Sequence, residues 1–284
     1  MPGLRDRLRD LWENLTASPA SPRSSNGASS FHLFWEMPRG AADERLVEAS
    51  ATLEVLEPPR VSSLYFWALQ VDFADEHGTI WGGGHTGLQW NRRFPEGTAV
   101  NWGGYASQER GGAVLPGSRP DLFAFPGDPN TTAFAWQTRR SYRLRIDRSP
   151  KSEGAWRAAV TDLETGETTV IRELWHPDAG PDDGGRSTHG GGRLGKGYLV
   201  RPMVWAEVFA ACDAPSVTVR WTDLVAVGEK SGSMRPQAVV VNYQSRREGG
   251  CANTSVRRDG DGFLQVTNTY RETEQGSRLE LEAG

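Results

Sequence analysis

The chain has 284 residues, 37% of them hydrophobic, which is enough to bury the core of one large domain. Its formal net charge is −4, and the arginines are spread among acidic residues instead of forming a basic block, so nucleic acid is excluded as an expected partner. The sequence holds no run of about 18 apolar residues and predicts no membrane-spanning helix.

The N-terminus, residues 1–16, has the pattern of a short amphipathic helix. Charged residues separate apolar ones that recur at three- and four-residue spacing, namely Leu4, Leu8, Leu11, Trp12 and Leu15. Residues 17–30 are rich in Ser, Pro and Ala and predict a flexible linker. Two interpretations stay open: the helix docks on its own domain, or it binds a protein partner from the end of this tether.

The same N-terminal segment lacks the uninterrupted apolar core of a signal peptide, so the chain as written is expected in the cytoplasm, with export by another route left open. The two cysteines, Cys212 and Cys251, both follow strand-like segments. A pair of free thiols and a disulfide across a sheet are equally compatible with this pattern. Two cysteines without a CxxC spacing form no zinc site by themselves.

Short strand patterns, separated by turn residues, dominate from residue 31 onward. They fall at 31–37, 51–57, 64–73, 85–91, 99–102, 122–125, 132–136, 142–147, 156–162, 168–174, 198–211, 216–221, 238–243 and 263–270. A long glycine-rich loop is expected between Pro177 and Gly197. Because no βαβ alternation occurs, we predict one all-β domain over 31–284: a two-sheet antiparallel sandwich of the jelly-roll or concanavalin A-like type, with a barrel as the alternative.

The stretch from Leu64 to Tyr105 combines the strongest strand signal with the densest polar and aromatic chemistry. Alternation predicts one buried face, made of Tyr65, Trp67, Leu69, Val71 and Phe73. From His85 the pattern resumes with Thr86, Leu88 and Trp90 on the opposite face from His85, Gln89 and Asn91. If the apolar set is buried, the polar set faces outward together.

This stretch predicts a sugar-binding site. Amides and an imidazole provide hydrogen bonds to hydroxyl groups, flat rings flanked by glycine provide exposed stacking surfaces, and glycines permit close approach. The candidate ligand-binding residues are Trp81, His85, Gln89, Asn91, Asn101, Trp102 and Tyr105.

Several short motifs resemble the concanavalin A-like lectin/glucanase superfamily and, more closely, a bacterial β-sandwich family of unknown function. They are Gly87-Leu88-Gln89-Trp90, residues 131–146, residues 156–161 and residues 204–209, so the resemblance spans roughly 31–230. It implies a sandwich whose concave face or rim loops bind carbohydrate, and it raises the expectation of a bound calcium ion. The Glu-x-Asp-x-(x)-Glu motif of the glucanase branch is missing, which lowers the expectation of a glycosidase.

An enzyme remains the first alternative, with Glu207 as a catalytic acid and Asp72 or His85 as its partner. The simpler interpretations are an ion pair between Glu207 and Arg143, Arg145 or Arg220, and a strand-end role for Asp72. Metal chelation is not indicated, because the histidines lack paired spacing and the Asp-Gly pairs at 259–262 are typical of turns.

Three functions are therefore carried forward. The first is a noncatalytic, lectin-like carbohydrate-binding protein with no required cofactor. The second is a polysaccharide-active hydrolase or lyase that uses Glu207. The third is a scaffold or interaction protein that acts through its N-terminal helix.

Overall fold

The computed structural model describes residues 21–40, 44–178 and 197–281. The predicted helix at 1–16 and most of the glycine-rich loop lie outside the described residues. Of the predicted linker, only residues 21–30 are described. They form a turn and then the start of the first strand, which begins at Ser29, two residues before the predicted domain boundary.

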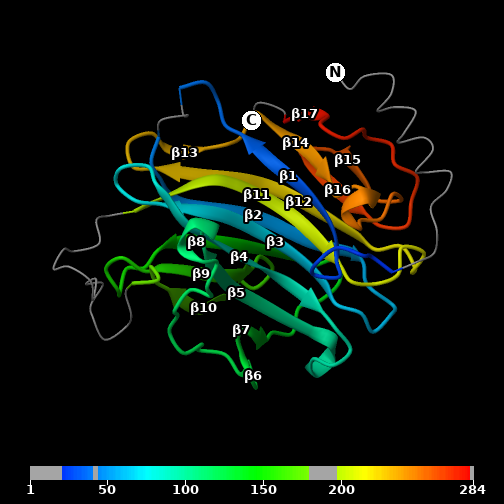
Figure 1. Ribbon diagram of the computed structural model, residues 1–284, viewed down its shortest axis with the longest axis horizontal. Helices are drawn as coiled ribbons and strands as arrows, with labels where there is room; N and C mark the ends of the chain where they lie inside the picture. Colours follow the sequence, from blue (N-terminus) through cyan, green and yellow to red (C-terminus); the bar gives the residue numbers. More distant parts are fainter. Residues whose placement is uncertain (1–20, 41–43, 179–196, 282–284) are drawn as a thin grey trace.

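The described chain is built from antiparallel strands with short 3-10 turns, so the predicted all-β fold is confirmed. Hydrogen bonds join the strands into one large curled sheet with two arms (Figure 1). The front arm contains, in pairing order, β6 (Ala124–Phe125), β7 (Asp128–Ala133), β5 (Thr98–Ala106), β4 (Ile80–Trp90), β3 (Tyr65–Ala74), β11 (Tyr198–Val208), β1 (Ser29–Glu36), β14 (Ala238–Tyr243) and β17 (Arg278–Glu280).

The back arm contains β10 (Thr168–Leu174), β9 (Trp156–Asp162), β8 (Ser141–Arg148), β2 (Leu46–Glu57), β12 (Thr218–Gly228), β16 (Gly262–Val266) and β15 (Ser255–Asp259), with β13 (Gly232–Met234) on the end of β12. The 3-10 turns are η1 (Pro95–Gly97), η2 (Gln108–Arg110) and η4 (Arg246–Glu248). The pairing of Leu199 with Leu46 joins β11 to β2 and thus connects the two arms.

The main core cluster lies between the two arms of this sheet. The face of β3 that was predicted to be buried is buried along its whole length, from Tyr65 to Phe73. The ring of Phe73 stacks on Trp156 of β9 with centroids 5.7 Å apart, which brings the inner faces of the two arms into direct contact. The alternate residues of β3 therefore face away from the core, onto the concave outer surface of the front arm.

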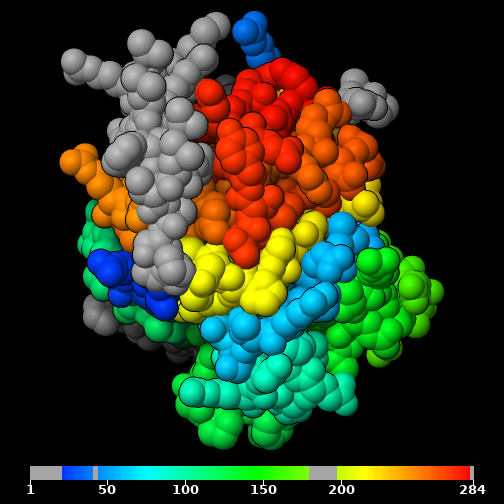
Figure 2. Space-filling model, turned by 90° about the vertical axis from the view of Figure 1, so that its right-hand side faces the viewer, coloured from blue at the N-terminus to red at the C-terminus, as the bar shows by residue number. Residues whose placement is uncertain are grey.

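Cys212 and Cys251 form a disulfide, with their Cα atoms 5.5 Å apart. It ties the segment after β11 to the segment before β15. Figure 2 shows the C-terminal part of the chain, in orange and red, packed on the yellow segment around residue 210. The question that the sequence left open is thus answered in favour of the disulfide. Among the described residues, no helix is long and apolar enough to cross a membrane.

Candidate ligand-binding cleft

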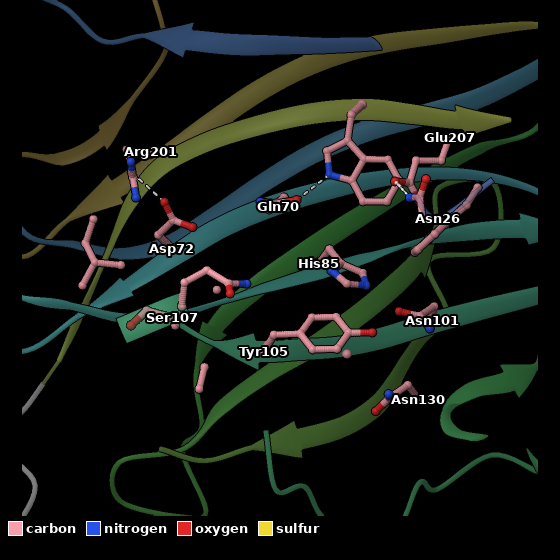
Figure 3. A pocket seen from close by; sticks show the side chains of 18 of the residues that line it. Asn26, Gln70, Asp72, His85, Asn101, Tyr105, Ser107, Asn130, Arg201 and Glu207 are labelled. Carbon is pink, nitrogen blue, oxygen red and sulfur yellow. Dashed lines mark hydrogen bonds and ion pairs between the residues drawn. The ribbon is translucent and has the colours of Figure 1, made fainter. Parts of the chain in front are cut away.

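An open cleft of about 1120 Å³ lies on the concave face of the front arm. Its lining comes from β1, β11, β3, β4, β5 and β7, together with the turn before β1 and the loop around η2 (Figure 3). Segments as distant in sequence as Asn26, His85 and Glu207 therefore contribute to one surface.

The antiparallel register explains how these segments converge, because paired residues point to the same face of a sheet. One transverse row runs through Trp205, Ala68, Gly87, Asn101 and Thr131. A neighbouring row runs through Glu207, Phe66 and Gln89, and another through Gln70, His85 and Gly103. In the first row, Trp205, Asn101 and Thr131 line the cleft, whereas Ala68 and Gly87 do not.

Four of the seven predicted ligand-binding residues line the cleft together. They are His85, Gln89, Asn101 and Tyr105. Tyr105 is 52% exposed, so the prediction of an exposed ring holds at this position. Asn91 lies beyond the end of β4, in a turn, where its side-chain oxygen accepts a hydrogen bond from the backbone N–H of Arg93 at 3.0 Å.

The prediction that Trp81 and Trp102 are exposed stacking surfaces is wrong. Both are buried, Trp102 completely, and the ring of Trp81 stacks on Phe73 with centroids 4.9 Å apart. The neighbouring glycines were misread. A Cβ atom on Gly84 would lie 2.7 Å from the Trp102 ring, so the missing side chain makes room for an indole in the core and does not open a path to it from outside.

Hydrogen bonds fix the orientation of three cleft amides. The Gln70 Oε1 atom accepts from Trp205 Nε1 at 2.8 Å, and Asn130 Oδ1 accepts from an Nη atom of Arg172 at 2.9 Å. The Nδ2 group of Asn101 donates to the Thr131 hydroxyl at 3.0 Å. Gln70 and Asn130 thus keep their N–H donors for a ligand, whereas Asn101 keeps its carbonyl oxygen.

Two amide oxygens in the cleft are buried and have no hydrogen-bond partner among the described residues. They are Gln89 Oε1 and Asn101 Oδ1, on side chains that are only 5% and 6% exposed. A buried acceptor without a partner costs about 1–3 kcal/mol, so natural proteins rarely keep one without a reason. An ordered water or a ligand that donates hydrogen bonds to these two oxygens would satisfy them.

Glu207 lies at one end of the cleft, beside Asn26 (Figure 3). Its carboxylate accepts hydrogen bonds from Asn26 Nδ2 at 3.1 Å and from the Ser30 hydroxyl at 3.3 Å. Burial raises the pKa of Glu207, and these two hydrogen bonds oppose that shift. Its carboxylate is therefore easier to protonate than an exposed one.

The predicted ion pair between Glu207 and an arginine does not occur among the described residues. The three candidate arginines pair elsewhere: Arg143 with Asp223, Arg145 with Asp147, and Arg220 with Glu54 and Asp259. Within the described part of the chain, the hydrogen-bond partners of Glu207 are thus neutral.

Asp72 lies at the opposite end of the cleft and forms an ion pair with Arg201 at 2.6 Å. Burial raises the pKa of Asp72, while the charge and hydrogen bond of Arg201 oppose that shift. Glu207 pairs with Phe66, which precedes Asp72 by six residues in β3, so the two carboxylates are separated by about 20 Å along the strand. A glycosidase pair is about 5–9.5 Å apart, so these two residues do not form one.

Two histidines in the cleft favour the neutral form. Burial lowers the pKa of both His32 and His85 to about 4. The His85 ring lies against aromatic side chains, with centroids 5.5 Å from Phe66, 5.7 Å from Trp205 and 6.3 Å from Tyr105. At neutral pH a neutral imidazole both donates and accepts one hydrogen bond, as a hydroxyl-rich ligand requires.

The described residues contain no group of three or more His, Cys, Asp or Glu side chains placed to hold a metal ion. At 259–262 the chain makes the predicted hairpin turn between β15 and β16, with Gly260 at a φ of 60°, and Asp259 pairs with Arg220 at 2.6 Å. Asp182 and Asp183 lie outside the described residues.

The site predicted from the sequence omitted several lining residues, including Asn26, His32, Gln70, Asn130 and Trp205. Gln70 was detectable, because strand alternation already placed it on the face opposite the buried rings of β3. The others were not detectable in this way. Asn130, for example, enters the cleft through the pairing of β7 with β5, which no local pattern reveals.

No family model matches the sequence, and no curated protein matches it. Among solved structures, the chain is similar to SCP-B, a member of the eqolisin family of peptidases, with 12% identity, 85% of this chain and 98% of that chain covered, and a TM-score of 0.43. It is also similar to peanut lectin (11% identity, 66% and 83% covered, TM-score 0.26) and to alginate lyase Aly36B (11%, 65% and 80%, TM-score 0.23). Such low identities and TM-scores give no information about what this chain binds.

Proposed function

We propose that the protein is a noncatalytic, lectin-like β-sandwich of the concanavalin A-like type that binds carbohydrate in its concave cleft. The observation that carries this proposal is the pair of buried oxygens, Gln89 Oε1 and Asn101 Oδ1, which lack a partner among the described residues. A ligand that donates hydrogen bonds would satisfy them, as an ordered water would. The oriented amides of Gln70 and Asn130 offer N–H donors to a ligand that also accepts hydrogen bonds. Hydroxyl groups do both.

The shape of the site supports the same ligand class. Tyr105 presents an exposed ring beside the amides, and the ring of His85 stacks against it at 6.3 Å. Gly87, between His85 and Gln89, lets β4 lie close against β3, because a Cβ atom there would come within 1.9 Å of the Trp67 carbonyl oxygen. An aromatic surface next to fixed polar groups matches the apolar face and hydroxyl rim of a pyranose.

Charge further narrows the ligand to neutral saccharides. The lining contains the carboxylates of Asp72, Glu109, Asp128 and Glu207. It also contains two arginines, both engaged with acids: Arg201 with Asp72 at 2.6 Å and Arg110 with Asp178 at 3.5 Å. A polyuronate or sulfated chain would meet a surplus of negative charge, whereas a neutral chain would not.

The proposal predicts that alanine in place of Tyr105 weakens saccharide binding by about tenfold, the effect of losing one stacked ring. Calorimetric titration with a panel of neutral and acidic oligosaccharides measures it. Because Tyr105 is exposed, the unfolding temperature should not change. Tyr270→Ala serves as a matched control, since Tyr270 is 69% exposed and lies outside the cleft.

Two results would contradict the proposal. One is a wild-type protein that binds no saccharide of any class. The other is a bound saccharide whose affinity is equal for the wild type and for Tyr105→Ala.

A hydrolase or lyase is the second candidate, and it is favoured by one observation: a buried Glu207 carboxylate whose pKa is raised and which no cation neutralises among the described residues. Asp72 is too distant to act with Glu207. His85 lies four residues along β4 from Gln89, the residue in the Glu207 row, so it is about 14 Å away along the strand, and Glu207 would have to act without either predicted partner. A carboxyl group with a raised pKa that lines a cleft is typical of a general acid, but structural acids also show this combination.

Glu207→Gln separates the two candidates, because glutamine keeps an oxygen for Asn26 and Ser30. If the protein only binds saccharide, we expect the wild type to cleave none. We also expect the saccharide affinity of Glu207→Gln to be within about threefold of the wild-type affinity, since one hydrogen-bonded group replaces another. Reducing-end and lyase assays on the wild type and the variant provide the measurement. Cleavage that Glu207→Gln abolishes, with binding and unfolding temperature retained, would establish the enzyme instead.

The interaction-protein hypothesis depends on residues 1–16, which lie outside the described residues. A protein partner for this segment stays a prediction.

A further inference from the structure

We propose that the saccharide continues out of the cleft onto an aromatic ridge formed by Phe94, Phe123 and Phe125, so that the ligand is an oligosaccharide and not a single sugar. This inference rests on the proposed carbohydrate-binding function. It assigns a second subsite to residues that do not line the cleft itself.

The strand register places Phe123 on the face of the sheet that forms the cleft. Gln89 of β4 pairs with Ala99 of β5, and Ala99 pairs with Ala133 of β7. The backbone N–H of Ala133 then donates to the carbonyl of Phe123 at 2.9 Å. The row that begins at Glu207 and passes through Gln89 therefore ends at Phe123.

Neighbouring residues confirm the side on which Phe123 points. Ala124 pairs with Thr132, which is fully buried in the core. Because side chains alternate along a strand, Phe123 points to the opposite face. A register shift follows between Ala124 and Phe125. Phe125 in turn pairs with Asp128, which lines the cleft.

The ridge is exposed and has a defined ring arrangement. Phe123 is 67% exposed, although most large apolar side chains of this protein are buried. Phe94 and Phe125 stack with centroids 4.8 Å apart, and Phe123 meets Phe125 edge to face at 6.2 Å. Rings that hold one another in place lose little conformational freedom on binding, which makes them suitable stacking surfaces.

The distance sets the length of the ligand. From Gln89 to Phe123 the row crosses three strand spacings, about 14 Å. Between them the row holds Ala133 and Ala99, which is fully buried, so the route from the cleft to the ridge leads past Asp128, which lines the cleft and pairs with Phe125. An oligosaccharide can reach both the amides and the ridge, whereas a monosaccharide cannot.

The test is a chain-length series of the neutral saccharide that binds best, from the monosaccharide upward, titrated into the full-length wild type, Phe123→Ala and the control Tyr270→Ala. We expect wild-type affinity to increase with length, and Phe123→Ala to lose about tenfold for the longer ligands and nothing for the monosaccharide. Tyr270→Ala should behave like the wild type at every length. Sedimentation velocity of each protein accompanies the titrations.

The outcomes separate this inference from the proposed function. Two results would overturn the proposal of a second subsite on the ridge while retaining the binding site in the cleft. One is an affinity that does not depend on ligand length. The other is an affinity that Tyr105→Ala weakens and Phe123→Ala leaves unchanged. Binding of no saccharide at all overturns both. A wild-type oligomer that Phe123→Ala dissociates, without a length-dependent loss of affinity, shows that the ridge is an interface between copies and also overturns the inference.

Discussion

Alanine in place of Trp102 should lower the free energy of unfolding by about 3–5 kcal/mol, the usual cost of removing a buried indole. The Trp102 ring is completely buried in the core, with its centroid 6.3 Å from that of Phe73, and it fills the space left by Gly84. β5 is held by its pairing with β4 and, up to Asn101, with β7, which limits collapse into such a cavity. Denaturant unfolding followed by circular dichroism measures the loss.

Tyr105→Ala is the matched comparison on the same strand. Because Tyr105 is half exposed on the other face of β5, this variant should be about as stable as the wild type. Saccharide binding by Trp102→Ala should fall only as far as the protein unfolds. A Trp102→Ala variant that is as stable as the wild type but has lost its saccharide affinity would show that Trp102 contacts the ligand. That result would contradict the burial of Trp102 in the core.

Removal of the disulfide should have an effect of similar size. The bridge closes a loop with a sequence separation of 39 residues, for which loop-closure entropy corresponds to about 4 kcal/mol. The double variant Cys212→Ala/Cys251→Ala should therefore unfold at a clearly lower denaturant concentration. Wild-type protein under reducing conditions should approach the same midpoint, whereas the double variant should be insensitive to reductant.

Mass spectrometry of the alkylated, unreduced protein provides the control. Two alkylated thiols in the native wild type, together with equal stability of wild type and double variant, would contradict the bridge. Disulfides persist mainly in oxidising compartments. The cytoplasmic location stays a prediction, and the bridge favours the alternative of export by another route.

The fold class was predictable because its signal is local and repeated. The alternation of Tyr65, Trp67 and Phe73 with smaller or polar residues specified which face of β3 is buried, and the structure has that face in the core. The order of strands across the sheet was not predictable. β11 lies between β1 and β3, which are neighbours neither of it nor of each other in the sequence, and long-range pairing of this kind leaves no periodic trace.

The candidate site was predictable to the extent that it lies on one hairpin. His85 and Gln89 on β4 face the cleft as their alternation suggested, and Asn101 and Tyr105, chosen for their aromatic and glycine neighbours, line it from β5. The errors at Trp81 and Trp102 share one cause: a glycine beside a ring indicates close packing as readily as exposure, and only the paired strand decides which. The hydrogen-bond partners of Glu207 were not predictable either, because Asn26 and Ser30 lie at the N-terminal end of the domain, far from Glu207 in the sequence.

The most direct test of the cleft is a saccharide titration followed by NMR of the side-chain amide groups, assigned by single substitution. We expect the NH₂ resonances of Gln70, Gln89, Asn101 and Asn130 to shift together and saturate at one ligand concentration, while those of Asn91, in its turn beyond β4, stay unchanged. Shifts confined to other amides, with these four unmoved at saturation, would show that the sugar binds elsewhere and that the concave face is not the site.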